Sequence, residues 1–473
     1  MIKLNKKSSR NNFLNSRGFS LIEILIALFV FSVTIAAVFM VSFGNQTILM
    51  NLKIYQDSLS VSQLNLEKAK ADARFNFPSV ESSEEIKGGF QENLEVSFFT
   101  DYTKEIKSKV RKLNVDLRDV GLPLYVSSFR DALGADTCFR RLIEPENYEI
   151  LETFPLEVSN PVTDIDVVRG KAYITINSII SPNFLVVDVS DTNNLEFISN
   201  SFGTIKKLTG LSVAGKYAYV STESTARQLQ VVNIENPQNP QLLSEFRLPD
   251  ISSTTIQSSI SYKDKKVYLG SEKHNFGQEF HIVDVENPQS PQYLGGFEVN
   301  TKVNAVAIKG DLTFIAVPNP TPLRVLDTAD YQNIQSINSY GTGGPTQHGG
   351  QAVAIAGDLL ALGRSVLSPG QTYHEVFLFD ISGNDLNLKA SKSIGLSIRD
   401  LILRDNILVV ASTFGSENKL QFLSIDEDNL LDVIHDIDLS EKPVALDCED
   451  DKLYVLTSNS NTQNSLVIIG KND

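Results

Sequence analysis

The chain has 473 residues, with 42 lysines and arginines against 57 aspartates and glutamates, a net charge of −15 and no tryptophan. A protein this acidic is poorly suited to nucleic acid or to anionic lipid headgroups, so we predict no nucleic-acid partner. The length suits two to four domains. The two cysteines, Cys138 and Cys448, give neither a disulfide framework nor the spacing of metal ligands.

The first hydrophobic segment runs from Phe19 to Phe43 and contains one charged residue, Glu23, and no proline. A helix of this length crosses a hydrocarbon core of about 30 Å. Residues 1–18 are basic and lack acidic residues, so the positive-inside rule predicts a cytoplasmic leader, a membrane span over about 19–43 and an extracytoplasmic remainder. A carboxylate inside the span is costly, and Glu23 therefore needs a partner.

The hexapeptide Gly18–Glu23 (GFSLIE) resembles the N-terminal cleavage and methylation motif of type IV pilins and pseudopilins. The basic leader, the glycine, the phenylalanine, a glutamate five residues into the mature chain and the apolar helix are all in register. The resemblance covers about residues 1–75. It implies that a prepilin peptidase cleaves between Gly18 and Phe19, that Phe19 is N-methylated, and that Glu23 serves in assembly with other pilin or pseudopilin subunits.

The chemistry agrees with that implication. Cleavage leaves a cationic amine on Phe19, and Glu23 of a neighbouring subunit can pair with it, so that two buried charges neutralise each other. The alternative is an uncleaved signal anchor in which Glu23 is incidental.

Residues 44–75 keep an apolar face opposite a charged one, which predicts that the helix continues from 19 to 75. In the pilin family such a helix packs against a small sheet, and we expect a small α+β pilin-like module and linker over 76–148. Strand-like alternation occurs at 94–98, 110–117 and 122–129, whereas 79–85 reads as a polar loop.

From about residue 150 the sequence repeats. Seven segments share one pattern of apolar residues, usually followed by aspartate, at steps of 43 to 53 residues. They are Phe184–Val189, Leu229–Ile234, Phe280–Val285, Leu323–Thr328, Val376–Ile381, Leu420–Ile425 and Ser465–Gly470. Most follow a hairpin signal with Gly or Asp at the turn and precede a polar turn and an outer strand. Four strands per repeat of this size indicate the blades of a β-propeller.

The pattern Leu-Val-Val-Asp-Val also resembles the LVIVD repeat family, which is regarded as a β-propeller; the resemblance covers about residues 150–473. The last repeat lacks an outer strand, and the stretch 149–158 before the first repeat can supply it and close the ring. The predicted fold is mainly β: a long N-terminal helix, a small module and a seven-bladed propeller over 149–473. Six or eight blades remain alternatives.

No constellation of catalytic or metal-binding residues emerges. The five histidines (His274, His281, His348, His374 and His435) lack metal spacing. His281 occupies a strand position, and His348 lies in a glycine-rich loop that we interpret as a connection. The recurring aspartates at 188, 284, 327 and 380 are interpreted as turn-fixing residues, and 380–385 and 426–429 as turns and not calcium sites. Alignment places Cys448 at an apolar position, favouring a buried thiol over a bridge to Cys138.

We therefore expect a non-enzymatic, cofactor-free minor or tip subunit of a type IV pilus or secretion pseudopilus, displaying a propeller that binds an extracellular ligand or surface protein. The ligand and its binding residues are not indicated by the sequence. The alternatives are a surface propeller that is tethered but does not polymerise, and an extracellular hydrolase built on the same fold.

Overall fold

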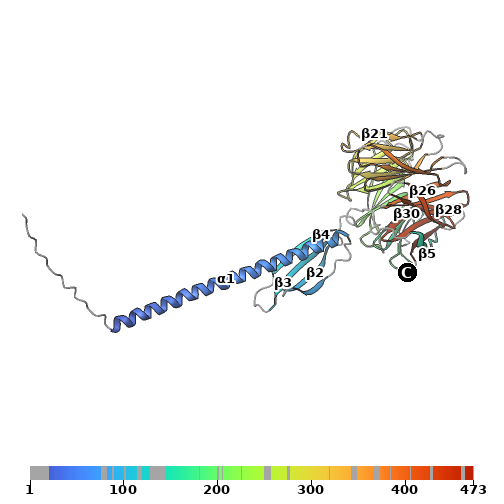
Figure 1. Ribbon diagram of the computed structural model, residues 1–473. Coiled ribbons are helices and arrows are strands. Elements are labelled where there is room, and N and C mark those ends of the chain that lie inside the picture. Colours follow the sequence, from blue (N-terminus) through green and yellow to red (C-terminus); the bar gives the residue numbers. More distant parts are fainter. Residues whose placement is uncertain are drawn as a thin grey trace, which may run out of the picture. The chain divides into compact units, whose positions relative to one another are not determined.

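The computed structural model consists of two compact units, residues 1–127 and 128–473 (Figure 1). The described residues are 21–75, 82–87, 90–100, 103–113, 120–127, 145–180, 182–199, 202–204, 206–224, 226–249, 257–273, 277–318, 320–341, 349–365, 373–383, 385–404, 406–426, 430–459 and 464–471.

The first unit contains one long helix and one antiparallel sheet. The helix α1 spans Leu21–Phe75. The sheet has the order β1-β2-β3-β4, with bounds β1 Ser83–Lys87, β2 Phe90–Thr100, β3 Thr103–Lys112 and β4 Val120–Ser127. Every strand thus pairs with its neighbour in sequence, which is the simplest way to build a sheet from a short segment.

The second half of α1 packs on this sheet. Leu66 and Ala69 of the helix form a small core with Ile106 of β3. Polar side chains flank that core: Ser62 Oγ donates to the carbonyl oxygen of Ser108 at 3.2 Å, and Asn65 Nδ2 donates to a Glu92 carboxylate oxygen at 3.0 Å. The apolar face predicted for residues 44–75 is thus only partly correct: Leu66 and Ala69 meet the sheet, whereas Leu52, Leu59 and Leu64 are exposed.

One local prediction for this unit was wrong. The stretch 79–85 was expected to be a polar loop, but Ser83–Lys87 form the edge strand β1, paired with β2. All five residues of β1 are exposed. Backbone pairing and a hydrogen bond from Gln91 Nε2 to the Glu84 carboxylate at 2.6 Å hold this strand. Neither requires an alternating apolar pattern that a sequence could display.

The described part of the second unit begins with a short 3₁₀ helix, η1 (Pro145–Asn147), followed by 28 strands in seven four-stranded antiparallel sheets. Their bounds are β5 Tyr148–Pro155, β6 Val162–Val168, β7 Lys171–Ile176, β8 Phe184–Asp188, β9 Glu196–Ser199, β10 Lys207–Ala214, β11 Tyr217–Glu223, β12 Leu229–Asn233, β13 Gln241–Phe246, β14 Gln257–Lys263, β15 Lys266–Ser271, β16 Phe280–Asp284, β17 Gln292–Phe297, β18 Ala305–Lys309, β19 Leu312–Ala316, β20 Leu323–Asp327, β21 Gln335–Tyr340, β22 Gly350–Ala356, β23 Leu359–Arg364, β24 Val376–Asp380, β25 Asn387–Lys392, β26 Ser397–Arg404, β27 Ile407–Phe414, β28 Glu417–Ile425, β29 Leu431–Asp438, β30 Lys442–Glu449, β31 Lys452–Ser458 and β32 Asn464–Lys471.

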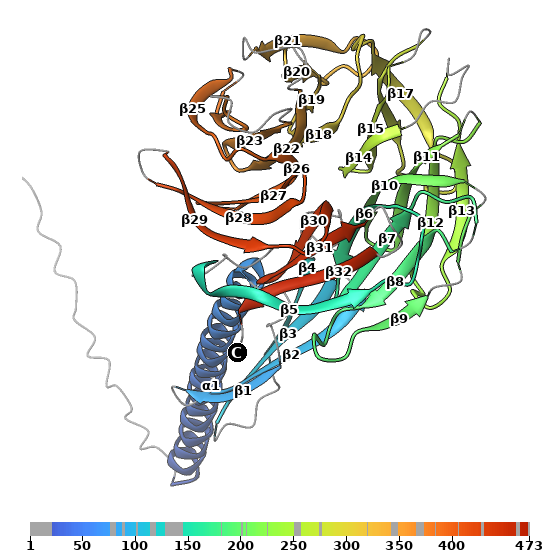
Figure 2. The same ribbon diagram turned by 90° about the vertical axis from the view of Figure 1, so that its right-hand side faces the viewer.

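The seven sheets follow one another around a propeller-like ring (Figure 2). The first strand of each sheet contacts the first strand of the next, from β6 through β10, β14, β18, β22, β26 and β30 and back to β6. Figure 2 shows these seven inner strands toward the middle of the ring and fourth strands such as β13, β17, β21, β25 and β29 at its periphery. The strand predicted for 149–158 is β5, which pairs with β32 in the last sheet.

The hydrophobic core of the ring is divided among the contacts between neighbouring sheets. Each of seven clusters of buried residues joins two adjacent sheets; one of them joins the last sheet to the first. The repeated apolar residues of the third strands fill these clusters, as Leu185 and Val187 do in one and Val231 in another. Because each sheet is covered on both faces, its middle strands read as continuous apolar runs.

The ring has two faces with different connections. Because adjacent strands run in opposite directions, the links from first to second strand lie at one end of each sheet, and the links from second to third at the other. Two residues separate the first strand from the second in all seven sheets. We call this end the hairpin face and the other the loop face. At the β14–β15 hairpin, Asp264 and Lys265 both have positive φ, 49° and 64°, as a two-residue turn of the primed type requires.

Candidate functional site

The residues of the methylation motif lie at the start of the chain. Gly18 and Phe19 fall outside the described residues. Glu23 lies in the first turn of α1, which begins at Leu21. The helical backbone at Glu23 agrees with the helix predicted from residue 19 onward, but it does not test the assembly role of its side chain.

Apolar side chains in the first half of α1 are exposed. Within residues 28–38 they are Leu28, Phe29, Val30, Phe31, Val33, Ile35 and Val38, with exposed fractions of 39 to 69%. The described part of the chain contains no helix long and apolar enough to cross a membrane.

The recurring aspartates at the ends of the third strands act as predicted. Oδ1 of Asp188, Asp284, Asp327 and Asp380 each accepts a hydrogen bond from the backbone N–H two residues later. Asn233 does the same in the second sheet. These residues close the turns of the hairpin face by the geometry of an Asx turn and are confirmed as turn-fixing residues.

A second set of buried polar side chains escaped the sequence analysis. They stand one residue before the third-strand pattern in five sheets, and each is at most 3% exposed: Asn183, Gln228, Glu279, Glu375 and Asn464. Their hydrogen bonds reach the connection that leaves the sheet on the loop face. Glu279 Oε2, for example, accepts from the N–H groups of Val299 and Asn300, both at 2.9 Å.

The members of this second set differ in chemistry but not in place. Asn183 accepts from the N–H of Thr204 at 2.9 Å and donates to its carbonyl oxygen at 2.8 Å. Gln228 accepts from Leu248 N at 2.9 Å. The only sequence signal is a polar residue before each apolar run, and such residues are common at strand starts, so the bonds could not be foreseen.

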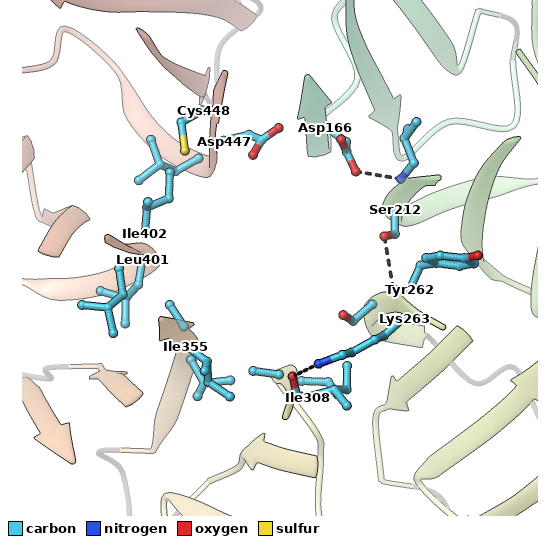
Figure 3. Close-up of a pocket in the computed structure, with 18 of the residues that line it drawn as sticks. Asp166, Ser212, Tyr262, Lys263, Ile308, Ile355, Leu401, Ile402, Asp447 and Cys448 are labelled. Atoms are coloured by element: carbon cyan, nitrogen blue, oxygen red, sulfur yellow. Dashed lines mark hydrogen bonds between the residues drawn. The ribbon is translucent and has the colours of Figure 1, made fainter. Parts of the chain in front are cut away.

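A cavity with a volume of about 460 Å³ lies at the centre of the ring. All seven inner strands line it, through the residues near their C-terminal ends, so it opens toward the hairpin face (Figure 3). Asp166 and Asp447 form one part of its wall and Lys263 another, while Leu401 and Ile402 form an apolar part. We call this space the central cavity.

Carboxylates of the inner strands bind the backbone of the next sheet around the ring. Asp447 Oδ2 accepts from Val167 N at 2.5 Å, and Asp166 Oδ2 accepts from Val213 N at 2.7 Å. Asp164 and Asp400 make the same kind of bond two residues further from the hairpin end of their inner strands. They accept from Leu211 N and Leu446 N, each at 2.8 Å. Each carboxylate bonds to an equivalent residue of the next sheet because the inner strands are equivalent in register. It satisfies an N–H on the inner edge of that sheet, where no further strand can pair.

The position of these carboxyls changes their titration. Each of these four carboxyls is partly buried in the wall of the ring. Burial raises the pKa of Asp164 to about 8, of Asp166 to about 7 and of Asp400 to about 6, against the lowering effect of their backbone hydrogen bonds. The pKa of Asp447 is raised by burial and then by the negative charge of Asp166.

These acidic residues were also missed. Asp164 and Asp166 alternate with the apolar Ile165 and Val167 along β6, which is the period of a strand with one wet face. That signal was present in the sequence. It says that two aspartates share a face, but not that the face lines a central cavity.

A cationic side chain of the central cavity is also tied to backbone. Lys263 Nζ donates to the carbonyl oxygen of Ile308 at 2.9 Å, a contact between the third and fourth sheets. Ser212 lies between the acidic wall and Lys263 and accepts from Tyr262 N at 3.2 Å. Two further charged residues line the cavity: Asp264, directly after Lys263, and Arg404, at the end of β26. In ring order Asp447, Asp166 and Lys263 come from the last, first and third sheets, so these two carboxyls and this ammonium group face the cavity from different walls (Figure 3).

The prediction that Cys448 is a buried thiol was wrong. Its side chain is buried, 1% exposed, in the cluster between the last two sheets, but it is disulfide-bonded. The chain's other cysteine, Cys138, lies outside the described residues. An apolar alignment position does not exclude a disulfide, because a bonded sulfur also packs well among hydrophobic side chains.

The histidines show no shared site in the described part of the chain. His281 pairs with Leu269 and Gly296 within its sheet and is 1% exposed, which confirms the predicted strand position. His435 contacts the carbonyl oxygen of Tyr148 at 2.9 Å. His274 and His348 fall outside the described residues. Among the residues that the structure describes, no three His, Cys, Asp or Glu side chains form a group that could hold a metal ion.

Two family models match the chain. The prokaryotic N-terminal methylation motif matches residues 14–39, and the LVIVD repeat matches residues 207–247. The first match contains Gly18, Phe19 and Glu23, and the second contains β10 to β13, a complete sheet of the ring. The chain thus carries a type IV pilin methylation motif fused to LVIVD repeat sequence.

Comparison with known proteins adds distant similarities. An uncharacterized protein of Methanocaldococcus jannaschii is 29% identical over 111 residues, which is 21% of this chain and 17% of that protein. The match thus spans less than a fifth of the relative's length.

Three solved structures are similar in fold. The computationally designed Ika8 protein has 11% identity and a TM-score of 0.45 over 66% of this chain and 98% of its own. BamB from Moraxella catarrhalis has 10% identity and a TM-score of 0.39 over 66% and 82%. Sqt1 of Saccharomyces cerevisiae has 9% identity and a TM-score of 0.47 over 68% and 98%.

Proposed function

We propose that the protein is a minor or tip subunit of a type IV pilus or secretion pseudopilus, and that the ring is a seven-bladed β-propeller that binds an extracellular ligand or surface protein. The observation that carries the proposal is the presence, in one chain, of the methylation motif at residues 14–39 and a ring built of repeats. One part supplies membrane anchoring and assembly, and the other supplies a large surface for recognition.

The N-terminal part works through its own chemistry in this proposal. Prepilin peptidase removes the leader 1–18 and Phe19 is N-methylated. Residues 19–43 then anchor the chain in the membrane, and Glu23 pairs with the amine of Phe19 on a neighbouring subunit. The exposed apolar side chains between Leu28 and Val38 support this, because lipid or neighbouring helices would cover them.

The disulfide at Cys448 supports an extracytoplasmic location for the ring. Structural disulfides form and persist in oxidising compartments and are rare in the cytoplasm. An extracytoplasmic ring agrees with the topology expected from the basic leader, which keeps the N-terminus in the cytoplasm and places the rest of the chain outside.

The size of the ring supports a minor or tip position. The seven sheets take up residues 148–471, more than two thirds of the chain. Subunits in the body of a filament repeat closely, so a domain this large is accommodated most easily at an end or as an occasional component. In this proposal residues 149–473 are the propeller, closed by β5 in the sheet of β32.

We assign the ring to binding and not to catalysis. The acidic side chains of the central cavity hold backbone N–H groups of neighbouring sheets, a role that accounts for their presence without a reaction. Loops at one face of a rigid ring are common places for recognition. The ring's buried Asn, Gln and Glu side chains hold such loops in place before a ligand arrives, which lowers the entropy cost of binding.

Incorporation into filaments tests the proposal. We expect Glu23→Ala to abolish recovery of the protein in sheared filaments while leaving its amount in membranes unchanged. The matched control is Glu67→Ala, on the exposed side of the same helix, where Glu67 makes a long 3.8 Å ion pair with Lys70. Recovery of Glu23→Ala in filaments at the level of Glu67→Ala would contradict the assembly role of Glu23. Absence of the parent protein from filaments would leave a tethered propeller that does not polymerise.

A further inference from the structure

The central cavity is lined on one wall by the carboxyl groups of Asp447 and Asp166 and on another by the ammonium group of Lys263. Asp447 and Asp166 accept from backbone N–H groups, and Lys263 donates to a backbone carbonyl oxygen. Burial and negative neighbours raise the pKa values of both carboxyls. An acidic wall and a cationic wall therefore face the same 460 Å³ space.

Apolar side chains form one side of the remaining wall, and Arg404 and Asp264 also line it. Leu401, Ile402 and Ile355 lie on the side of the cavity away from Ser212 (Figure 3). Small-molecule sites commonly combine a mostly apolar lining with a few charged or polar groups that fix orientation, in volumes of about 300–1,000 Å³. The central cavity meets that description, with residues from every sheet of the ring.

We propose that the central cavity binds an extended zwitterion, with its ammonium group against Asp166 and Asp447, its carboxylate against Lys263, and an apolar spacer along Leu401 and Ile402. An ω-amino acid or a short peptide with free ends has this form. The inference rests on the proposed role of the ring as a binding domain and names a ligand class for it.

The positions of the charges favour an extended ligand over simpler ones. The acidic wall comes from the last and first sheets and Lys263 from the third, so the charges of the ligand must be several bonds apart. A simple amine leaves Lys263 without an anion, and a simple carboxylate meets two acids. A metal ion is not favoured, because the described residues contain no suitable group of three ligands. Charge-assisted hydrogen bonds at both ends give the zwitterion its advantage.

Calorimetric titration of the full-length protein in detergent micelles tests the inference. The probe is 6-aminohexanoate, with hexylamine and hexanoate as ligands of the same length that each carry one of its charges. We expect 6-aminohexanoate to bind at least about tenfold more tightly than either. Equal affinity of the three ligands, or no binding of 6-aminohexanoate, would overturn the inference.

Two variants locate the ligand. Asp447→Asn keeps an acceptor for Val167 N but loses the charge, and Lys263→Met loses the ammonium group. Each is expected to weaken 6-aminohexanoate binding by at least about tenfold. The matched controls are Asp451→Asn and Lys265→Met, at neighbouring hairpins; Lys265 pairs with Glu286 and is 58% exposed. Unchanged binding in both cavity variants would contradict the site.

Thermal melts check that each variant is folded. If Asp447→Asn unfolds, the Lys263→Met variant and the comparison of the three ligands still test whether the zwitterion binds in the central cavity. The outcome is independent of filament assembly, because Glu23 lies outside the ring: a Glu23→Ala protein that fails to assemble is still expected to bind 6-aminohexanoate with unchanged affinity.

Discussion

The two faces of the ring are held by different kinds of side-chain contact. On the hairpin face, Asp188 and its equivalents bind backbone N–H groups two residues away, so each turn is fixed by its own sequence. On the loop face, Glu279 holds a connection about 20 residues further along the chain, and its equivalent Asn464 holds one near the start of the ring. The first face is locally encoded, whereas the second depends on the whole sheet being folded.

Energetics distinguish the faces as well. A turn-fixing aspartate is partly exposed and makes a bond that water can replace, so its loss costs little. When a buried Glu or Asn on the loop face is replaced, backbone N–H groups are left unpaired in the interior. The folded protein is then destabilised by the full desolvation cost of those N–H groups. Substitutions on the two faces should therefore differ in size.

The largest effect is expected from Glu279→Ala on the loop face. The change leaves Val299 N and Asn300 N without their acceptor and opens a small cavity. We expect a loss of about 3 kcal/mol in the free energy of unfolding. Urea denaturation of the full-length protein in detergent measures it. Glu279→Gln keeps one acceptor oxygen and serves as the control; a loss as large as that of Glu279→Ala would show that the charge, and not the hydrogen bonds, matters.

A pH dependence of stability is expected from the buried carboxyls of the inner strands. In the unfolded chain these aspartates have a pKa near 3.8, but in the ring the values of Asp164, Asp166 and Asp400 are about 8, 7 and 6. The folded protein therefore holds protons that the unfolded chain releases. This contribution to stability is complete below about pH 4 and is lost as the pH rises toward 8.

Denaturation at pH 5, 6.5 and 8 measures this dependence. Asp166→Asn should flatten the slope, because the amide cannot ionise, whereas Asp451→Asn, at an exposed hairpin, should leave it as it is. Stability that rises from pH 5 to pH 8 in the parent protein would contradict the raised pKa values.

A smaller effect is expected from Asp284→Ala on the hairpin face. The substitution removes the acceptor for Glu286 N, a bond of 2.7 Å at an exposed turn. We expect a loss of about 1 kcal/mol, measured by the same urea series. A loss equal to that of Glu279→Ala would remove the distinction between the faces.

The smallest effect, and the only gain, is expected at the β14–β15 hairpin. Lys265 has a φ of 64°, a conformation that glycine adopts without the steric cost of a Cβ. Lys265→Gly should stabilise the ring by about 0.5 kcal/mol after the loss of an exposed ion pair with Glu286. Lys216→Gly, before Tyr217 at the equivalent hairpin where Gly215 has the positive φ, should give no such gain.

The same contrast explains which features could be predicted from the sequence. Hairpins, turns and the third-strand pattern are local, and together they indicate four strands per repeat. Strand β5 could be placed because the last repeat lacked a partner strand. The edge strand β1 was missed because an exposed strand held by polar contacts leaves no apolar pattern.

The central cavity lay beyond sequence reasoning for a physical reason. The bond from Asp447 to Val167 joins residues 280 positions apart, and nothing at either position specifies the other. The disulfide at Cys448 was misjudged for the same reason, since its partner is not encoded locally. The assembly motif was found because its chemistry is contiguous: Gly18, Phe19 and Glu23 occur in one short run.

The N-terminus of the protein isolated from membranes tests the central claim most directly. Mass spectrometry should find a mature chain that begins at N-methylated Phe19 and lacks residues 1–18. An intact Met1, or a chain cut elsewhere, would contradict the pilin-type processing on which the account depends.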